Sequence, residues 1–362
     1  MRTLKYLFIS ILAIFIIACE SGIDPITPVN PGPDKTDPVI QIQYPLEGTL
    51  IRVREDVTPI KIQVDATDDI ELASVAISLD GTEIATFSDF KDYRHAIISH
   101  NYATLTNGKH TLSVSAKDLS GKASTQSVKF EKVEPYTPKF DGEIFYVPFD
   151  GDYLDLVSIN EATKVGNPSF ANGKFQKAYL GAADAYLTFP TKDESKGLNL
   201  LGAEFSAAFW YKLNSSPNRA GILVIGPVDT ENPTKMNNRN HGFRFFREGS
   251  SSKQTFKLNA GNGTSDAWFD GGDNASLTNN GEWVHIAFTI SKTKCTIYFN
   301  GKVVSDGVFT GISWAGCDLL SIGSGAPRFT GWDHLSDQSL IDELRIFNKA
   351  LTQNEVQAMI AN

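Results

Sequence analysis

Apolar and polar residues alternate along much of this chain, and residues 282–301 show the pattern most clearly. Every second residue from 284 to 290 is apolar, which is the period of two expected for a strand with one buried face. The alternation resumes after a polar turn at 291–294, and Asn300-Gly301 can then adopt the positive φ of a tight hairpin turn. The stretch therefore predicts neighbouring antiparallel strands of a meander.

Short alternating segments separated by turn residues also fill residues 39–134. Asp80-Gly81 and Asn107-Gly108 stand where hairpin turns are expected. About seven strands in about 95 residues is the spacing of a sandwich made of two sheets. We therefore predict that residues 39–134 form a first β domain.

A larger β region follows a short link that contains proline, at residues 134–140. Strand-like segments recur through the rest of the chain, and their number and spacing predict a jelly roll or a similar large sandwich with one core. Thr352 and Glu355 have the spacing of a capping box, which predicts a helix at the end of the chain. The second domain is expected to span residues 142–362, and the apolar side of its helix to comprise Val356, Met359 and Ile360.

The first nineteen residues have the pattern of a bacterial lipoprotein leader. Arg2 and Lys5 precede an apolar run that is too short to span a bilayer but suits a secretory signal. Residues 16–19, Ile-Ile-Ala-Cys, resemble a lipobox, in which the cysteine becomes the lipidated first residue of the mature protein. We therefore expect residues 1–18 to be a signal peptide and Cys19 to carry the lipid. The alternative is an uncleaved anchor with an incidental cysteine.

Residues 19–38 are rich in proline and poor in large apolar residues, which is typical of an extended spacer. Such a tether would hold the protein to a membrane through acyl chains. We therefore expect a location in the cell envelope, at the outer membrane and exposed on the surface. In an oxidising compartment Cys295 and Cys317 could form a disulfide or could be two small buried hydrophobic residues, and the sequence leaves both open.

The 362 residues carry a net charge of −9, and the pI is near 5.2. Binding to a phosphate backbone requires clustered Lys and Arg residues, which no stretch of this sequence supplies. Nucleic acid is therefore not an expected partner.

Both domains resemble known families. Residues 107–123 resemble the closing strands of bacterial immunoglobulin-like domains, with Asp118 and Gly121 at the D-x-x-G corner. The second domain resembles the laminin-G-like, concanavalin A-like jelly rolls of bacterial surface proteins at residues 149–156, 173–181, 205–212, 283–301 and 341–356. The resemblance implies an all-β protein, with an N-terminal immunoglobulin-like sandwich followed by a concanavalin A/laminin-G-like jelly roll. It does not set the function, because this architecture carries lectins, adhesins, hydrolases and spacers.

In such a fold the first and last strands of the domain should pair side by side. Asp150 and Asp152, which follow the first strand, would then meet Asp342 at the start of the last. Carboxylate and carbonyl oxygens are the ligands that Ca²⁺ prefers, so we predict a structural calcium site at these three residues. The alternative is that Asp342 only accepts hydrogen bonds from backbone amides.

The sequence contains no recognised catalytic motif. G-x-S-x-G, H-E-x-x-H and the glycine patterns that bind phosphates or dinucleotides do not occur. A glycanase of the concanavalin A type would need a strand that presents carboxylates at alternate positions, whereas Asp342 and Glu343 are adjacent and point to opposite faces. We therefore expect no enzymatic activity and name no catalytic residue.

Sugars are bound by flat aromatic faces together with amides, acids and arginines, usually in loops. Three segments offer this combination, at residues 237–244, 259–280 and 325–339. The alternative is that their tryptophans fold back as lids on the edge of the sandwich. The residues that we expect to bind a ligand are Arg239, His241, Trp268, Asp270, Asn274, Arg328 and Trp332.

These features favour an envelope lipoprotein that binds a poly- or oligosaccharide through loops of the jelly roll, with the first domain as a spacer. The arrangement resembles the accessory glycan-binding lipoproteins of polysaccharide uptake systems in Bacteroidetes, which implies an outer-membrane uptake complex as a partner. The alternatives are an adhesin or assembly factor that binds a protein, which predicts a broad exposed apolar patch, and a glycoside hydrolase, which predicts a groove with two facing carboxylates.

Overall fold

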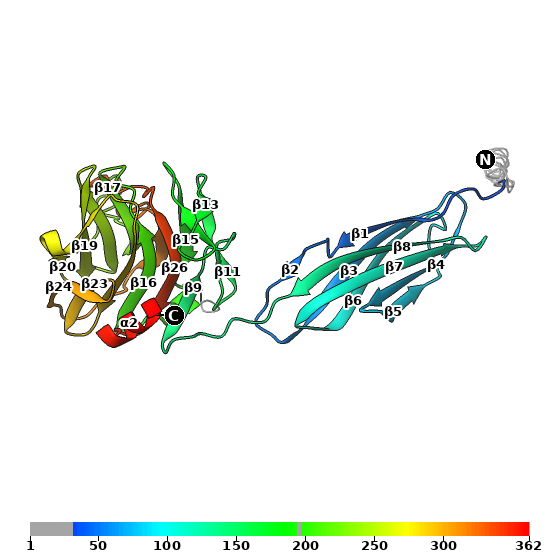
Figure 1. Cartoon of the computed structure of the whole chain (residues 1–362), viewed down its shortest axis with the longest axis horizontal. Helices are drawn as coiled ribbons and strands as arrows, with labels where there is room; N and C mark the ends of the chain where they lie inside the picture. The colour runs from blue at the N-terminus through cyan, green and yellow to red at the C-terminus, as the bar shows by residue number, and fades with distance from the viewer. Residues whose placement is uncertain (1–31, 194–196, 362) are drawn as a thin grey trace, which may run out of the picture. The chain divides into compact units, whose positions relative to one another are not determined.

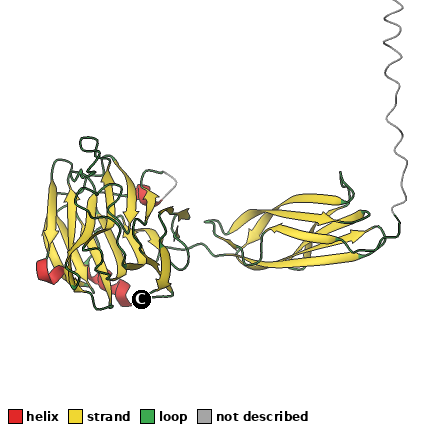
Figure 2. Cartoon of the chain, turned by 90° about the horizontal axis from the view of Figure 1, so that it is seen from above, coloured by secondary structure: helices red, strands yellow, loops and turns green. Residues whose placement is uncertain are grey.

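The computed structural model describes residues 32–193 and 197–361. The predicted signal peptide at 1–18, the lipidated Cys19 and the first part of the tether lie outside the described residues. In the part that is described, no helix is both long enough and apolar enough to cross a bilayer. The chain divides into two compact units, of which the first includes residues 57–132 and the second residues from 133 onward. Both are built almost entirely from strands (Figure 1, Figure 2).

The first unit is a sandwich of two sheets with strand orders β1-β3-β6 and β2-β8-β7-β4-β5. Its core consists of every second residue of its longer strands, for example Ile60, Ile62 and Val64 of β3. This is the sandwich of two sheets that the alternation predicts. The strands are β1 (Val39–Tyr44), β2 (Leu50–Ile51), β3 (Val57–Thr67), β4 (Leu72–Leu79), β5 (Thr82–Phe87), β6 (His95–Thr106), β7 (Gly108–Asp118) and β8 (Ala123–Lys132).

The turns of this unit follow from their residue types. Asp80 and Gly81, between β4 and β5, have φ of 52° and 81°, as a tight hairpin requires. Asp118 is buried, and its Oδ1 accepts hydrogen bonds from the backbone amides of Gly121 (2.7 Å) and Lys122 (2.8 Å). The D-x-x-G corner therefore closes as its sequence predicts.

The second unit consists mainly of two eight-stranded sheets, which we call the front and back sheets. The front sheet has the order β12-β15-β25-β17-β18-β19-β20, with β21 paired to β19. Its strands are β12 (Thr163–Val165), β15 (Tyr186–Pro190), β17 (Arg219–Pro227), β18 (Phe243–Gly249), β19 (Lys253–Gly261), β20 (Asp266–Asp270), β21 (Ser276–Thr278) and β25 (Cys317–Ile322).

The back sheet has the order β13-β14-β26-β16-β22-β23-β24, with β9 paired to β26. Its strands are β9 (Glu143–Val147), β13 (Ser169–Asn172), β14 (Lys177–Leu180), β16 (Phe205–Lys212), β22 (Trp283–Ile290), β23 (Lys294–Phe299), β24 (Lys302–Val308) and β26 (Leu340–Phe347). The remaining elements are the hairpin β10 (Leu154–Asp155) and β11 (Asn160–Glu161), the 3₁₀ turns η1 (Gly197–Leu200) and η2 (Gly272–Ala275), and the helix α2 (Gln353–Ala361).

The two sheets enclose an aromatic core. Phe245 of the front sheet stacks on Phe288 of the back sheet, with ring centroids 4.8 Å apart, and Phe243 and Phe205 pack beside them. The β22–β23 hairpin contributes its alternate apolar residues to this core, as its pattern predicts. Asn300 and Gly301 have φ of 46° and 73°, so the next turn is also the predicted one.

The first and last strands of the second unit pair as expected, with Val147 of β9 opposite Leu344 of β26. The helix α2 begins with the predicted capping box: Glu355 Oε2 accepts from the Thr352 amide (2.7 Å), and Thr352 Oγ1 accepts from the Glu355 amide (3.3 Å). Val356 is buried against the outer face of the back sheet, where the helix covers one end of the sheet.

The cysteines of the second unit are both free thiols. Cys295 and Cys317 are buried in its core and form no disulfide. Burial raises the pKa of both thiols, that of Cys317 to about 11, so that neither is reactive at neutral pH. The sequence leaves open whether these cysteines form a disulfide or are two small buried hydrophobic residues. In the structure they are two small buried residues.

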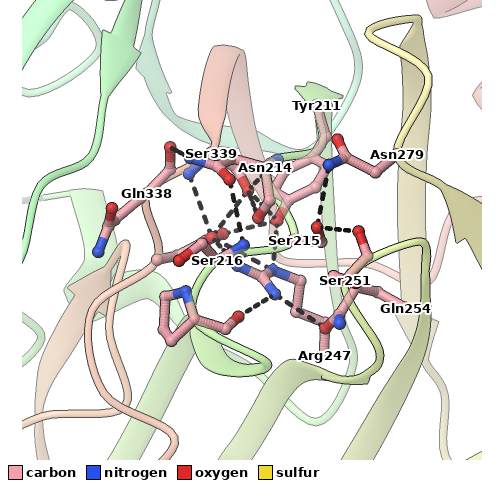
Figure 3. A network of polar contacts seen from close by, with 12 residues as sticks. Tyr211, Asn214, Ser215, Ser216, Arg247, Ser251, Gln254, Asn279, Gln338 and Ser339 are labelled. Carbon is pink, nitrogen blue, oxygen red and sulfur yellow. Dashed lines mark hydrogen bonds and ion pairs between the residues drawn. The ribbon is translucent and has the colours of Figure 1, made fainter.

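A buried ion pair belongs to a network of polar contacts inside the second unit (Figure 3). Arg247 Nη2 lies 2.8 Å from Asp337 Oδ1, and the two side chains are 0% and 1% exposed. The Tyr211 hydroxyl donates to Asp337 Oδ2 (2.7 Å), and Ser339 Oγ donates to Asp337 Oδ1 (2.8 Å). Gln254 Oε1 accepts from Arg247 Nη1 (2.8 Å). Side chains from β16, β18 and β19 are thus joined to the segment before β26.

This network fixes the segment of residues 323–339, which we call the 323–339 loop. The Asp337 amide donates to the Gly323 carbonyl (2.8 Å), and the Gly325 amide donates to the His334 carbonyl (2.9 Å). The two ends of the loop are therefore held together, and the Asp337 carboxylate anchors the loop to the core. The position of any side chain on this loop depends on that anchor.

We predict that Asp337→Asn lowers the free energy of unfolding by about 3–5 kcal/mol, because it leaves the buried charge of Arg247 uncompensated. The matched control is Asp273→Asn, which breaks the ion pair between Lys253 and the 93% exposed Asp273 and should cost less than about 1 kcal/mol. Urea denaturation of the two variants measures the difference. Equal losses would contradict the role given to the buried pair.

Candidate functional site

The outer face of the front sheet carries a row of large side chains. In β20, Asp266, Trp268 and Asp270 point outward, while Phe269 between them is part of the core. Trp268 and Asp270, which we expected in a loop at 259–280, therefore lie in a strand, and Trp268 stands opposite Asn259 of β19. A strand fixes the direction of the indole more firmly than a loop would.

Trp332 of the 323–339 loop lies against Trp268. Their ring centroids are 5.7 Å apart with an interplanar angle of 21°, and the side chains remain 40% and 41% exposed. The loop is seated on the sheet by Phe329 and His334, which are buried against Phe246 of β18 at centroid distances of 5.4 and 4.4 Å. Neither tryptophan is buried as a lid on the sandwich, because much of each indole stays in contact with solvent.

Arg239 joins the two indoles. Its guanidinium carbon lies 5.4 Å from the ring centroid of Trp268 and 4.8 Å from that of Trp332, within the range of cation–π contacts. Its Nε is 3.6 Å from Asp266 Oδ2, which also accepts from Asn259 Nδ2 (2.7 Å). Three of the residues that the sequence singles out thus lie together.

Charged side chains surround the aromatic pair. Lys257 Nζ bridges Glu248 Oε1 and Asp270 Oδ2, at 2.9 Å from each, and Lys257 faces Asp270 directly across the β19–β20 ladder. Arg219 Nε lies 3.7 Å from Glu248 Oε2, and its Nη1 donates to the Trp332 carbonyl (3.2 Å). With the aromatic residues these groups line an open depression of about 470 Å³. We call it the aromatic–arginine site, lined by Arg219, Arg239, Phe246, Glu248, Lys257, Trp268 and Trp332.

The charges of the site compensate one another. Burial alone would raise the pKa of Glu248, but the hydrogen bonds from Lys257 and His334 outweigh it and lower the pKa. Burial lowers the pKa of His334 to about 4, so its imidazole is neutral at pH 7. Each cation of the site has a carboxylate partner at Asp266, Asp270 or Glu248. The site therefore presents fixed polar groups with little net charge.

The other predicted ligand-binding residues do not line the aromatic–arginine site. Arg328 is held by Asp318, with Nη2 at 2.8 and 2.9 Å from the two carboxylate oxygens. His241 Nδ1 is 2.9 Å from Ser313 Oγ. Asn274 belongs to the exposed 3₁₀ turn η2. The predicted Asp270 lies beside the site, paired with Lys257.

Sequence reasoning missed four lining residues: Arg219, Phe246, Glu248 and Lys257. Phe246, Glu248 and Lys257 lie on the face opposite the core residues of their strands, such as Phe245 of β18 and Phe256 of β19. The period of two could therefore have placed them on one face. Their proximity to Trp268 depends on which strands are neighbours, which no local pattern states.

The predicted calcium ligands are only partly brought together. Asp342 Oδ1 is buried and has no hydrogen-bond partner among the described residues, while Oδ2 accepts from the Phe175 amide (3.0 Å). Asp150 is near enough for its charge to act on Asp342. Asp152, in contrast, accepts from the Leu154 amide (3.2 Å) and forms an ion pair with Arg52. Asp152 thus has protein partners of its own, and the site of three aspartates stays a prediction.

A cation would fit the orphaned oxygen of Asp342. Burial, together with the charges of Glu343 and Asp150, raises the pKa of Asp342 to about 7, although the Phe175 amide opposes the shift. Within residues 32–193 and 197–361 there is no group of three or more His, Cys, Asp or Glu side chains that could hold a metal. Any calcium here would need backbone carbonyls or water to complete its shell.

Two family models match the chain. Residues 181–357 match the concanavalin A-like lectin/glucanases superfamily, and residues 38–114 match the bacterial Ig domain. A search of curated proteins gives no significant match. The two matches agree with the two sandwiches of the structure, so the protein is all-β, with a bacterial immunoglobulin-like domain followed by a concanavalin A-like jelly roll. The match at 181–357 includes every residue that lines the aromatic–arginine site.

Several solved structures are similar to the chain. Domain 4 of AbnA, a GH43 extracellular arabinanase from Geobacillus stearothermophilus in complex with arabinotriose, is 20% identical, with a TM-score of 0.46 and coverage of 60% of this chain and 97% of that one. The binding domain of Paraclostridial Mosquitocidal Protein 1 is 16% identical (TM-score 0.42; coverage 60% and 52%). The binding domain of botulinum neurotoxin DC in complex with SialylT is 17% identical (TM-score 0.42; coverage 61% and 51%). The chain thus spans about half the length of the two toxin domains.

The raised pKa of Asp342 predicts a pH dependence of stability in a buffer that contains a chelator. Between about pH 4 and pH 7 the folded protein keeps a proton on Asp342 that the unfolded chain has lost, so stability should fall as the pH rises through this window. Asp342→Asn cannot lose this proton and should flatten the profile and be more stable than the wild type above pH 7. Urea denaturation across the window measures both, and parallel profiles would contradict the assignment.

Proposed function

We propose that the jelly roll binds carbohydrate at the aromatic–arginine site and does not act on it chemically. The observation that carries this proposal is the pair of stacked, about 40% exposed indoles of Trp268 and Trp332 beneath the guanidinium of Arg239. Exposed aromatic surface of this size is costly in water unless a ligand covers it. The match to a superfamily of lectins and glucanases supports the same function.

The site has groups that suit both the apolar C–H face and the hydroxyls of a sugar. The C–H faces of a pyranose or furanose ring pack on an indole, and its hydroxyls need fixed donors and acceptors. Lys257, Glu248 and Arg219 supply these groups, and their ion pairs hold them in place beside the indoles. The polar groups are thus ordered before a ligand arrives, which reduces the entropy cost of binding.

The charge balance favours a neutral glycan. Arg219, Arg239 and Lys257 are each matched by a carboxylate, so that no cation is left over for a uronate or a sialate. The chain as a whole has a net charge of −9 and would repel a polyanion. A neutral polysaccharide or oligosaccharide is therefore the class of ligand that we infer.

The carboxylates of the site are poor candidates for glycoside hydrolysis. A glycosidase needs a pair of carboxyl groups, one of them with a raised pKa that lets it act as the acid. For Glu248 and Asp270, burial would raise the pKa, but the hydrogen bonds from Lys257 outweigh it, and both pKa values are lowered. Both groups remain ionised, which suits hydrogen bonding to hydroxyls.

We propose the cellular setting from the sequence. Cys19 is lipidated after removal of residues 1–18, and the tether of residues 19–38 and the immunoglobulin-like domain act as spacers that hold the jelly roll away from an outer membrane. On the cell surface such a protein would deliver glycan to an outer-membrane uptake complex. This setting rests on the leader pattern and on the resemblance to Bacteroidetes lipoproteins.

The binding proposal predicts that the purified protein is retained by at least one neutral polysaccharide. Trp268→Ala and Trp332→Ala should each weaken binding about tenfold or more, because each removes a stacking surface. Arg239→Met keeps an apolar chain over the indoles and should therefore weaken binding less than either tryptophan variant does. Affinity electrophoresis against a panel of polysaccharides measures the retention.

The matched control is Val308→Ala, an 85% exposed apolar residue on β24, which should leave retention unchanged. Retention that survives both tryptophan variants would place the glycan elsewhere. If no polysaccharide retains the protein and an envelope or host protein binds it instead, the adhesin alternative replaces the proposal.

We also propose a structural Ca²⁺ at Asp150 and Asp342, supported by the orphaned Asp342 oxygen. A metal that binds only the folded state must stabilise it. Calcium should therefore raise the thermal unfolding midpoint of the wild type above its value in chelator, and it should have no effect on Asp342→Asn. A wild-type midpoint that is the same with calcium and with chelator would contradict the proposal.

A further inference from the structure

A second cavity, of about 280 Å³, lies on the outer face of the back sheet. It is bordered by strands β9, β16, β22 and β26, by Phe175 and Gln176 of the turn before β14, and by Met359 of α2. It is distinct from the aromatic–arginine site, which lies on the outer face of the other sheet. Its volume is close to the lower end of ligand pockets, about 300 Å³, which suits a ligand of one sugar ring.

The floor of the cavity is formed by Trp210 and His285. These residues face each other across the β16–β22 ladder, and their rings meet edge to face with centroids 5.3 Å apart. Both belong to the outward alternation of their strands, since Phe209 and Ile286 beside them are core residues. Lys174 Nζ lies 4.6 Å from the Trp210 ring centroid, at the edge of the site.

His285 is the unusual group. Its side chain is 3% exposed, and Nδ1 is buried without a hydrogen-bond partner among the described residues. Burial lowers its pKa to about 4, so the ring is neutral at pH 7. A buried polar atom without a partner costs about 1–3 kcal/mol. His285 lines the cavity, and a group that reaches Nδ1 there, after the small ring movement that the burial of this atom requires, would recover that cost.

The wall of the cavity is polar and internally paired. The Tyr146 hydroxyl donates to Glu343 Oε2 (2.9 Å), and Arg345 Nη2 lies 3.0 Å from the same oxygen. Arg345 also covers the Tyr146 ring at 3.6 Å and forms an ion pair with Glu143. Arg345 alone does not balance Glu143 and Glu343, and Asp150 also lines the cavity. Lys139 in the lining and Lys174 at its edge supply the two further positive charges, so the surroundings of the cavity have little net charge and offer hydrogen bonds to a neutral ligand.

We propose that this cavity binds a single neutral sugar residue, with a ring C–H face toward Trp210 and a hydroxyl on His285 Nδ1. A hydroxyl both donates and accepts, so it satisfies Nδ1 in either tautomer of the imidazole. An apolar ligand would leave that nitrogen without a partner. The inference does not depend on glycan binding at the aromatic–arginine site, because no lining residue is shared.

The test uses ¹⁵N-histidine-labelled protein, which has six histidines, and the monosaccharides glucose, galactose, mannose, xylose and arabinose as probes, with glycerol as the additive control. His285→Phe assigns the His285 ring signal. At least one monosaccharide should shift this signal with saturation, at concentrations at which glycerol does not. Calorimetry with the same sugar should give an affinity that falls about tenfold in His285→Phe and in Trp210→Phe.

Trp332→Ala separates the two sites, since it should weaken polysaccharide binding about tenfold or more and leave the His285 shift unchanged. The inference fails if none of the five sugars moves the His285 signal, if glycerol moves it equally, or if His285→Phe binds the sugar as tightly as the wild type does. It also fails if Trp332→Ala removes the shift, because the shift would then originate at the aromatic–arginine site. Thermal unfolding checks that the substituted proteins are folded.

Discussion

The buried pair of Arg247 and Asp337 is the interaction on which the arrangement of the candidate site depends. The free energy of removing two charges from water offsets most of the attraction between them, so such a pair adds little to stability. Its value here is positional. Asp337 is the point where the 323–339 loop enters the core, and Tyr211, Gln254 and Ser339 complete the hydrogen bonds that make this one position favourable.

From that anchor the loop runs across the outer face of the front sheet. Phe329 and His334 fill the space over Phe246, and Trp332 comes to rest against Trp268. The aromatic pair is therefore assembled from a strand and a loop that are far apart in sequence but are both fixed to the same core. The back sheet presents a different surface, where α2 covers one end and a polar cavity opens beside Trp210 and His285.

The sequence predicts much of this fold because alternation is local: the β22–β23 hairpin, its Asn300-Gly301 turn and the capping box at Thr352 each depend on neighbouring residues. Trp268, Trp332 and Arg239 could be singled out because aromatic and basic residues are unexpected among Gly, Asn and Asp. The contact between these three residues depends on the order of strands in the sheet, and so do the ion pairs of Lys257 with Glu248 and Asp270. Strand order cannot be predicted from local sequence patterns. Pairing of the end strands likewise does not determine how close the side chains of Asp150, Asp152 and Asp342 come. The anchoring role of Asp337 could not be predicted, because the sequence does not distinguish a buried aspartate from a solvated one.

The central claim is that the two anchored indoles form the sugar-binding surface. The most direct measurement is a crystal structure of the protein with an oligosaccharide cut from the polysaccharide that retains it best. The account predicts a sugar ring in contact with Trp268 or Trp332, with hydroxyls bonded to Arg239, Glu248 or Lys257, and the 323–339 loop in the same position. An oligosaccharide bound only away from these residues, with both indoles still open to solvent, would contradict it.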